Sequence, residues 1–134
     1  MTSQQPTPTA LNFTPDNLRA FAYSGPVAVT NDENTLIEFT TNSEYLVAKV
    51  GIGSLEAQGD DYGWRIYMND IIINGRYLDR TYNEGYDMDV ITEFIIPPFT
   101  NFKMTLDNHT GASGRTWMAM LSARAYGMTE TGYQ

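Results

Sequence analysis

The chain contains no cysteine and only one histidine among its 134 residues. The absence of cysteine excludes a disulfide framework, a thiolate metal centre and a cysteine nucleophile. The single histidine, His109, cannot build a metal site that needs several imidazole ligands. These two absences remove most cofactor chemistry that depends on sulfur or nitrogen ligands, and no cofactor is expected.

Positive charge is also scarce, because 8 Lys and Arg stand against 16 Asp and Glu and the formal net charge is -8. Proteins that bind nucleic acid neutralise its phosphates with clustered cations, so we expect no nucleic-acid partner. Long apolar runs are missing too, since none approaches the roughly 20 residues that span a bilayer. The first ten residues lack the basic and apolar segments of a signal peptide. We therefore expect neither a membrane partner nor secretory export.

The residues that are abundant favour strands and turns. The chain has 16 Thr, 10 Asn, 9 Tyr and 11 Gly, whereas residues that favour helix surfaces are few. A chain of this length forms one domain by default. The sequence predicts an extended Pro/Thr-rich arm at 1–17, a β-sandwich domain at 18–127 and a short polar tail at 128–134.

The arm holds three of the six prolines, which favour extended backbone and oppose regular structure. Leu11 and Phe13 are its two apolar exceptions, and they are spaced as on one face of a strand. They predict a short extended piece that docks against this domain or against a neighbouring molecule. The alternative is a frayed terminus.

Between residues 18 and 127 the sequence alternates short apolar runs with turn residues. We count eight or nine strands in about 110 residues, with turn signals every ~8 to 12 residues, as in sandwiches and barrels. The predicted fold is an all-β antiparallel sandwich, jelly-roll-like, behind the N-terminal arm. The predicted core consists of Ile37, Phe39, Leu46, Val50, Ile52, Trp64, Ile66, Phe94, Ile96, Phe102, Met104, Leu106, Trp117 and Leu121.

Two hairpins are predicted from the spacing of these runs. The first joins residues 35–41 to 45–52 through three residues, an ordinary hairpin length. The second joins 64–68 to 71–78 through Asn69 and Asp70, which tolerate the positive φ of a tight turn. The Asn74-Gly75 pair within 71–78 is a turn or a bulge, and we favour a bulge inside one long strand.

No pattern in the sequence indicates an enzyme. His109 lies in a polar turn, where a solvated side chain is the simpler interpretation than a general base. Paired carboxylates in two long loops could serve glycoside hydrolysis or hold Ca²⁺. Neither loop has the calcium-loop pattern, so a solvated acidic loop is favoured over a weak calcium site. The residues of that weak candidate are Asp60, Asp61, Asp87 and Asp89.

Arginine and methionine point instead to contacts with protein. Six of the eight basic residues are Arg, several beside an aromatic residue, and Arg is favoured over Lys at interfaces. Methionines on a nominally outward strand face can mark a contact or fill a gap in the core. The protein-contact candidates are Leu11, Phe13, Arg76, Tyr77, Arg80, Arg115, Met118 and Met120.

The pattern as a whole resembles the decoration, or cement, proteins on the capsids of tailed bacteriophages. The phrases that carry the resemblance are YLVAKVGIGS, GWRIYMNDIIING, EFIIPPFTNFKMTLDN and TWMAMLSARAYG. It implies a virion location on the capsid surface after assembly in the host cytoplasm. It also implies a homotrimer, the major capsid protein as partner, and a terminal arm that reaches along the shell or a neighbouring subunit.

The same pattern is similar to carbohydrate-binding modules and to the heads of phage fibres. Under that alternative, loop aromatics such as Tyr62, Tyr82 and Tyr86 would bind a glycan or a receptor. A jelly-roll enzyme is the weakest of the three hypotheses, because one histidine cannot supply the metal ligands of a cupin-like centre. A virion structural protein is therefore the favoured function.

Overall fold

The computed structural model describes residues 10–29, 32–54, 62–78, 88–108 and 115–127. Side chains are described in these ranges except at 54, 76–78, 88–92, 108 and 115. All regular structure in this part of the chain is β-strand, so it contains no helix that could span a membrane. The strands are β1 (Asn12–Phe13), β2 (Arg19–Tyr23), β3 (Val27–Val29), β4 (Asn34–Thr40), β5 (Tyr45–Ser54), β6 (Tyr62–Met68), β7 (Ile71–Leu78), β8 (Met88–Ile96), β9 (Asn101–Asn108) and β10 (Arg115–Tyr126).

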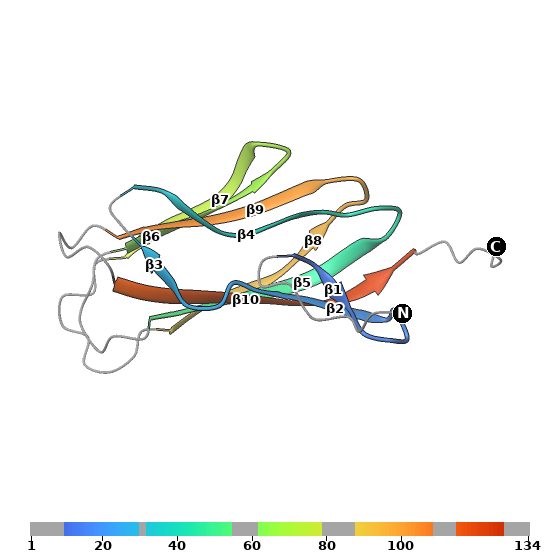
Figure 1. Cartoon of the computed structure of the whole chain (residues 1–134). Coiled ribbons are helices and arrows are strands. Elements are labelled where there is room, and N and C mark those ends of the chain that lie inside the picture. The colour runs from blue at the N-terminus through green and yellow to red at the C-terminus, as the bar shows by residue number, and fades with distance from the viewer. Residues whose placement is uncertain (1–9, 30–31, 55–61, 79–87, 109–114, 128–134) are drawn as a thin grey trace.

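Two antiparallel sheets stack as the layers of a sandwich (Figure 1). The six-stranded sheet has the order β1-β2-β10-β5-β8, with β3 also paired to β10, and the four-stranded sheet has the order β4-β9-β6-β7. The predicted all-β antiparallel sandwich is confirmed.

The strand order is that of a jelly roll. From β3 onward the chain crosses to the other sheet at each connection except the β6-β7 hairpin. The strands β2 and β3 pair with successive stretches of β10, so they act as one interrupted strand. Eight strands in two four-stranded layers remain once β1 is set aside, as a double Greek key requires.

The interruption between β2 and β3 is held by Ser24. Its backbone N–H donates to the Ala119 carbonyl at 3.0 Å, and its Oγ accepts from the Ala119 N–H at 2.9 Å. Gly25 follows with a φ of 70°, a conformation that glycine adopts without steric cost. The side chain of Ser24 thus replaces a ladder partner where the strand breaks, which keeps buried backbone groups hydrogen-bonded.

The core lies between the sheets and is built from alternate residues of their facing strands. Of the predicted core residues, Phe94 is partly buried against the core and all the others are buried. Aromatic rings pack within it, with centroids 5.2 Å apart for Phe39 and Phe102 and 4.3 Å apart for Tyr62 and Trp117. Buried side chains of this size each contribute roughly 1.5–3 kcal/mol to folding.

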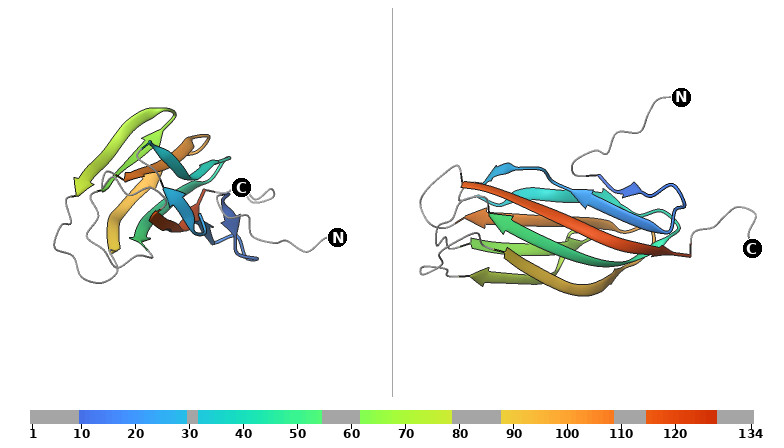
Figure 2. Two further views of the ribbon diagram at one scale, coloured as in Figure 1. Left: turned by 60° about the vertical axis from the view of Figure 1, so that its left-hand side comes forward. Right: turned by 90° about the horizontal axis from the view of Figure 1, so that it is seen from below.

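Within the predicted extended arm, Asn12 and Phe13 form a strand of the domain. β1 pairs with β2, so that Asn12 lies opposite Phe21 and Phe13 opposite Ala20. Leu11 and Phe13 are half-buried and pack against the domain's own core. β1 therefore forms one edge of the six-stranded sheet, next to β2 (Figure 2). Of the two predicted docking targets, these side chains use their own domain.

The predicted hairpin between 35–41 and 45–52 is wrong. β4 and β5 belong to different sheets, paired with β9 and with β10 and β8 respectively. The connection is fixed by Thr41, whose Oγ1 donates to the Pro97 carbonyl at 2.7 Å and accepts from the Thr100 N–H at 2.9 Å. Both strands have an apolar face, and these faces are buried better when the strands are stacked in opposite layers than when they lie side by side.

The second predicted hairpin is confirmed. β6 and β7 are joined by Asn69 and Asp70, with φ of 53° and 67°, the left-handed pair of a tight hairpin turn. The register shifts between Ile66 and Tyr67, which leaves Ile73 as the additional residue of β7. The strand runs on through Asn74 and Gly75, so one long strand rather than a second turn is confirmed, but the bulge lies at Ile73, directly before the predicted pair.

Phe99, in the turn between β8 and β9, has a φ of 52° and an exposed fraction of 72%. A left-handed conformation costs a residue with a Cβ about 1–2 kcal/mol, and this exposed ring recovers little of that cost through packing. We predict that Phe99→Gly is about 1 kcal/mol more stable than Phe99→Ala, because only glycine removes the strain. Urea denaturation of the two variants measures the difference. Equal stabilities would contradict the prediction.

Candidate protein-contact surface

The outer face of the six-stranded sheet has two adjoining hollows. Its strands bring together residues far apart in sequence, because residues directly opposite in an antiparallel pair share a face. Met120 lies opposite Tyr23 and Gly51, and Ser122 lies opposite Phe21 and Lys49. This row of positions forms the floor and walls of both hollows.

The first hollow has a volume of about 400 Å³ and is predominantly apolar. Met118 and Met120 of β10 form one side and Tyr23 of β2 lies beside them, with Gly51 and Gly53 of β5 opposite the two methionines. The Tyr23 hydroxyl is 3.5 Å from the Met118 sulfur. Met120 remains 49% exposed, so an incoming side chain can reach it.

Glycine is the reason that the hollow exists. Two glycines at alternate positions of β5 remove two outward side chains from the middle of the sheet. Glycine in a strand interior lowers stability and marks a bulge, a bend or a close approach by a ligand or another backbone. The flexible methionines opposite can adjust to an irregular partner surface. The hollow is therefore suited to receive an apolar side chain of another protein.

The second hollow, about 550 Å³, is a charged groove on the same face. Arg19 of β2, Arg124 of β10 and Lys49 of β5 line it, with Glu93 of β8 as its one acidic lining residue. Lys49 and Ser122 line both hollows, so the two are continuous. Three of the chain's eight basic residues thus gather at one place on an acidic protein.

The charged groups of the groove are held by local contacts. The Arg124 guanidinium is 4.0 Å from the Glu93 carboxylate and 5.6 Å from the centre of the Tyr126 ring. Beside the groove, the Thr14 hydroxyl donates to Asp16 at 2.7 Å and the Leu18 N–H donates to it at 3.1 Å. These hydrogen bonds, with a smaller contribution from nearby Arg19, lower the pKa of Asp16. Arg124 and Glu93 are each about half exposed, so their pairing is weak and leaves Arg124 open to a further partner.

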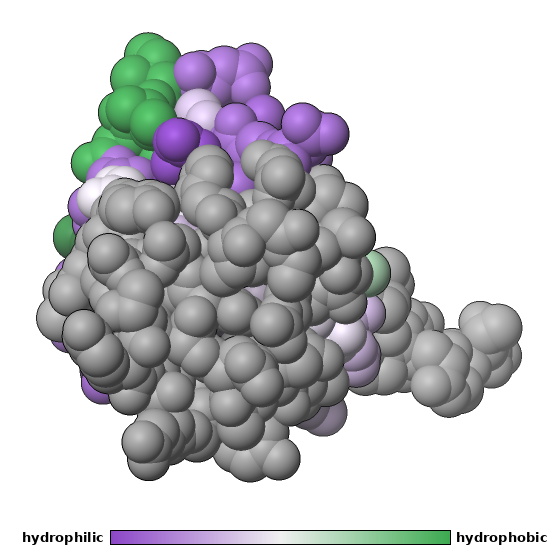
Figure 3. All heavy atoms as spheres, turned by 90° about the vertical axis from the view of Figure 1, so that its left-hand side faces the viewer, coloured by the Kyte–Doolittle hydropathy of each residue, from purple (hydrophilic) through white to green (hydrophobic). Residues whose placement is uncertain are grey.

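A second apolar surface lies on the other sheet. Ile71, Ile72 and Ile73 at the start of the edge strand β7 are 67%, 51% and 48% exposed. Figure 3 shows a green apolar patch at the top of the molecule, beside hydrophilic surface. We call these three residues the isoleucine patch. Contiguous exposed apolar side chains on an edge strand are a common mark of a contact site.

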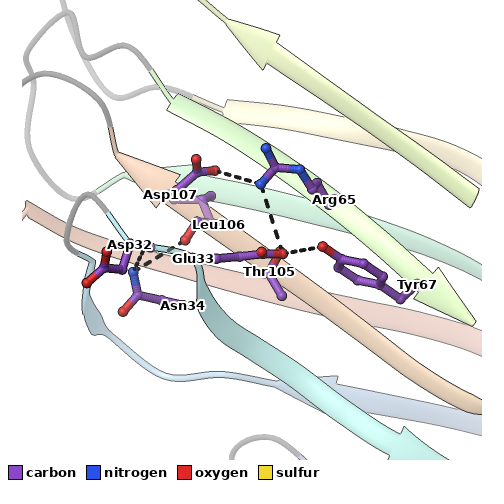
Figure 4. Close-up of polar contacts among 8 residues, drawn as sticks. All are labelled: Asp32, Glu33, Asn34, Arg65, Tyr67, Thr105, Leu106 and Asp107. Carbon is purple, nitrogen blue, oxygen red and sulfur yellow. Dashed lines mark hydrogen bonds and ion pairs between the residues drawn. The ribbon is translucent and has the colours of Figure 1, made fainter. Parts of the chain in front are cut away.

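A polar cluster lies on the outer face of the four-stranded sheet (Figure 4). The Glu33 carboxylate accepts hydrogen bonds of 2.5 Å from both the Tyr67 hydroxyl and the Thr105 hydroxyl. Arg65 lies 3.9 Å from Glu33 and 3.5 Å from the buried Asp107. These charged groups pair with one another within the cluster. Their contacts link the residue before β4 to β6 and β9.

The cluster changes the titration of two of its members. The hydrogen bonds from Thr105 and Tyr67, and then the positive charges of Arg65 and Lys103, lower the pKa of Glu33. The hydrogen bond to Glu33, followed by desolvation and the Glu33 charge, raises the pKa of Tyr67. Both shifts favour a Glu33 carboxylate paired with a neutral tyrosine at pH 7, an arrangement that stabilises the fold.

Of the predicted contact residues, Met118 and Met120 are brought together in the apolar hollow. The backbone of Arg76 and Tyr77 lies in β7 opposite Trp64 and Gly63, and that of Arg115 begins β10. β7 belongs to the four-stranded sheet, whereas the two methionines lie in β10 of the six-stranded sheet. Arg80 lies outside the described residues.

The weak calcium candidates fall mostly outside the described part of the chain. Asp60, Asp61 and Asp87 are outside it, as is His109, and the backbone of Asp89 lies in β8 opposite Ile52. Within the described ranges, no three His, Asp or Glu side chains are grouped so that they could hold a metal ion.

Tyr62, one of the tyrosines predicted to bind a glycan under the alternative function, is not available at the surface. Tyr62 is fully buried and packs on Trp117 in the core. It faces inward because β6 carries Tyr62, Trp64 and Ile66 on its core side. Tyr82 and Tyr86 lie outside the described residues.

The charged groove and the role of the glycines were not predicted from the sequence. Arg19, Lys49 and Arg124 are isolated in sequence, and only the pairing of β2, β10 and β5 makes them neighbours. The glycines did carry a signal, because a strand with glycine at two alternate outward positions, as in VGIGS, is unusual.

No protein-family model matches the chain, and no curated protein does. Several solved structures are similar in fold. One is dimeric latent PorU from Porphyromonas gingivalis, at 11% identity and a TM-score of 0.48, where the match covers 78% of this chain and 11% of that one. Another is a structure of the infectious bursal disease virus Gx strain, at 16% identity and a TM-score of 0.46, covering 87% of this chain and 31% of that one.

A third is a family 35 carbohydrate-binding module from Clostridium thermocellum. It has 9% identity and a TM-score of 0.39, and the match covers 78% of this chain and 70% of the module. The chain thus spans less than a third of each of the first two structures. At these TM-scores the likeness carries no functional conclusion, and the jelly-roll assignment rests on the strand order.

The Glu33 cluster generates a pH prediction. Because the folded pKa of Glu33 is lowered, its contribution to stability is present above the ordinary value of 4.5 and is lost as the pH falls through the folded value. Tyr67→Phe removes one donor, so the pKa of Glu33 should rise toward 4.5 and acid unfolding should begin at higher pH. At pH 7 the loss should be about 0.5–1 kcal/mol, since Glu33 is partly exposed.

Carboxyl NMR titration and urea denaturation at pH 7 and pH 3.5 measure both effects. Tyr23→Phe is the matched control, because among the described residues that hydroxyl contacts the Met118 sulfur rather than a carboxylate. A Glu33 pKa that is the same in Tyr67→Phe and in the unaltered protein would contradict the assignment.

Proposed function

We propose that the chain is a non-catalytic protein that binds another protein through the outer face of its six-stranded sheet. We further propose that it is a virion structural protein that decorates a capsid and contacts the major capsid protein. The observation that carries the proposal is the apolar hollow of Tyr23, Gly51, Gly53, Met118 and Met120 on the outer face of the sheet. The resemblance of the sequence to capsid decoration proteins supports the choice of partner.

Such a role depends on the surface area buried between the two proteins and requires no catalysis. A stable protein contact buries roughly 800 Å² on each partner, and symmetry repeats it over a shell. Within such an area a few well-packed apolar side chains supply most of the affinity. Met120 and the space opposite it at Gly51 are suited to be that central contact, and the charged groove beside them gives orientation.

The glycan-binding alternative has less support from the described residues. A sugar ring stacks on an exposed aromatic face, and Tyr62 offers none because it is buried. The walls of the apolar hollow are formed largely by methionine and glycine. These residues suit an irregular protein side chain better than a flat sugar ring.

We predict that filling the hollow abolishes capsid binding without unfolding the domain. Gly51→Val occupies the space opposite Met120, and valine favours a strand, so the fold should be kept. Met120→Lys places a charge on the contact. Each variant should bind at least about tenfold more weakly, as expected for a central contact. The assay is co-sedimentation of the purified protein with capsids assembled without it.

Thr35→Lys is the control, since it adds the same charge at an exposed position on β4 in the other sheet. It should bind as the unaltered protein does. Full binding by Gly51→Val would show that the hollow is not the contact. Absence of capsid binding by the unaltered protein at micromolar concentration would overturn the capsid role.

Self-association as a homotrimer is part of the proposal. In a closed ring of three copies each contact joins two different surfaces. The isoleucine patch of β7 is the described surface that best supports one side of that contact, because it is apolar and uncharged. A net charge of -8 makes the copies repel one another, which favours an uncharged contact.

We predict that Ile72→Lys converts the trimer to a monomer, since a buried lysine without a partner opposes association. Size-exclusion chromatography with light scattering measures the mass. Thr40→Lys, an exposed change on β4 at the opposite edge of the same sheet, should leave the trimer intact. A monomeric unaltered protein would contradict the proposed trimer, and a trimeric Ile72→Lys would exclude the isoleucine patch as the contact.

A further inference from the structure

The charged groove and the apolar hollow meet at Lys49 and Ser122 and form one continuous surface. We propose that this surface recognises an acidic protein segment in which an apolar side chain stands next to one or more carboxylates. The apolar side chain fills the hollow beside Met120, and the carboxylates face Arg19, Lys49 and Arg124. This inference rests on the proposed protein-binding function and names the chemistry of its partner.

The local charge of the groove favours an acidic partner. The groove lining carries three cations and one carboxylate, whereas the whole chain carries 8 basic and 16 acidic residues. The sign of the local charge is therefore opposite to that of the molecule. Such a local reversal favours a partner that brings a few negative charges to this place and not elsewhere.

The position of Arg124 also favours a carboxylate on the partner. Arg124 lies against the Tyr126 ring, and Glu93 pairs with it only at 4.0 Å. An arginine presents a planar fork that binds a carboxylate through two parallel hydrogen bonds. A carboxylate from a partner can form that bidentate contact on Arg124, which the long Glu93 contact does not provide.

The apolar hollow decides between kinds of anion. A sulfated glycan or an inorganic phosphate would use the cations and leave the 400 Å³ apolar hollow empty. A nucleic acid would bring many phosphates toward a molecule with a net charge of -8, which repels it over the rest of the surface. A protein segment supplies both the apolar side chain and a small number of carboxylates.

Glu93 is the acidic residue of the groove lining, so its charge should affect the affinity for an acidic partner. It repels an incoming carboxylate and competes with it for Arg124. Glu93→Gln should therefore bind the acidic segment more tightly than the unaltered protein does. A groove that merely stabilises the sheet would not gain affinity from this change.

The probes are three acetylated, amidated hexapeptides: SLSDES, its amide counterpart SLSNQS, and SSSDES, which lacks the leucine. Titration of the ¹⁵N-labelled full chain at 25 mM and 250 mM salt gives affinity and location together. SLSDES should bind at least about fivefold more tightly than either matched peptide at low salt and should weaken at high salt. Amide shifts should concentrate at Lys49, Gly51, Met120, Ser122 and Arg124.

The variants Lys49→Gln and Arg124→Gln should each weaken SLSDES binding at least about threefold, and Glu93→Gln should strengthen it. Lys103→Gln is the matched control, because it removes the same charge from the outer face of the four-stranded sheet, where Lys103 lies over Tyr67. It should leave the affinity unchanged.

Equal affinities for SLSDES and SLSNQS, or shifts centred on another surface, would overturn the inference. Tighter binding of a ten-nucleotide dT strand or a heparin disaccharide at the same residues would overturn it in favour of another anion. The capsid assay separates the two proposals. Capsid binding that is unaffected by Lys49→Gln and Arg124→Gln refutes the acidic segment alone, whereas peptide recognition without any capsid binding refutes the capsid role alone.

Discussion

The alternation of side chains along β10 is the constraint on which both the fold and the contact surface depend. β10 pairs with β2 and β3 on one side and with β5 on the other, so it holds the six-stranded sheet together. Its inward residues, Trp117 and Leu121 among them, are buried in the core, while Met120 and Arg124 face outward. A shift of one residue in this register would exchange the two sets and destroy core and surface together.

The outer faces of the two sheets differ in how completely their polar groups are paired. On the four-stranded sheet, Glu33, Arg65 and Tyr67 use their charges and hydrogen bonds on one another and stabilise the fold. On the six-stranded sheet, the glycines open space and the cations Arg19, Lys49 and Arg124 remain exposed. A cluster whose polar groups are paired internally has little to offer a partner, so we assign the proposed contact with the capsid protein to the other face.

Much of the fold could be predicted because strand patterns are local. Ile66 and Met104 alternate with polar residues, and burial of alternate residues follows directly from the geometry of a strand. The Asn69-Asp70 turn was also local, since its residue types permit positive φ. The crossing from β4 to β5 was not, because a three-residue connection fits a hairpin as well as a passage between layers. The contact of Thr41 with Thr100, 59 residues away, decides between them.

The sequence by itself determined an acidic all-β domain without cysteine, its core residues, and an outward position for Met118 and Met120. The tertiary structure decided which strands share a sheet, that Leu11 and Phe13 pack on their own domain, and that Tyr62 is buried. It also decided that Arg19, Lys49 and Arg124 line one groove beside the apolar hollow. The physical reason is that a contact surface on a sheet is assembled across strands, and cross-strand neighbours are set by pairing between distant segments rather than by local preference.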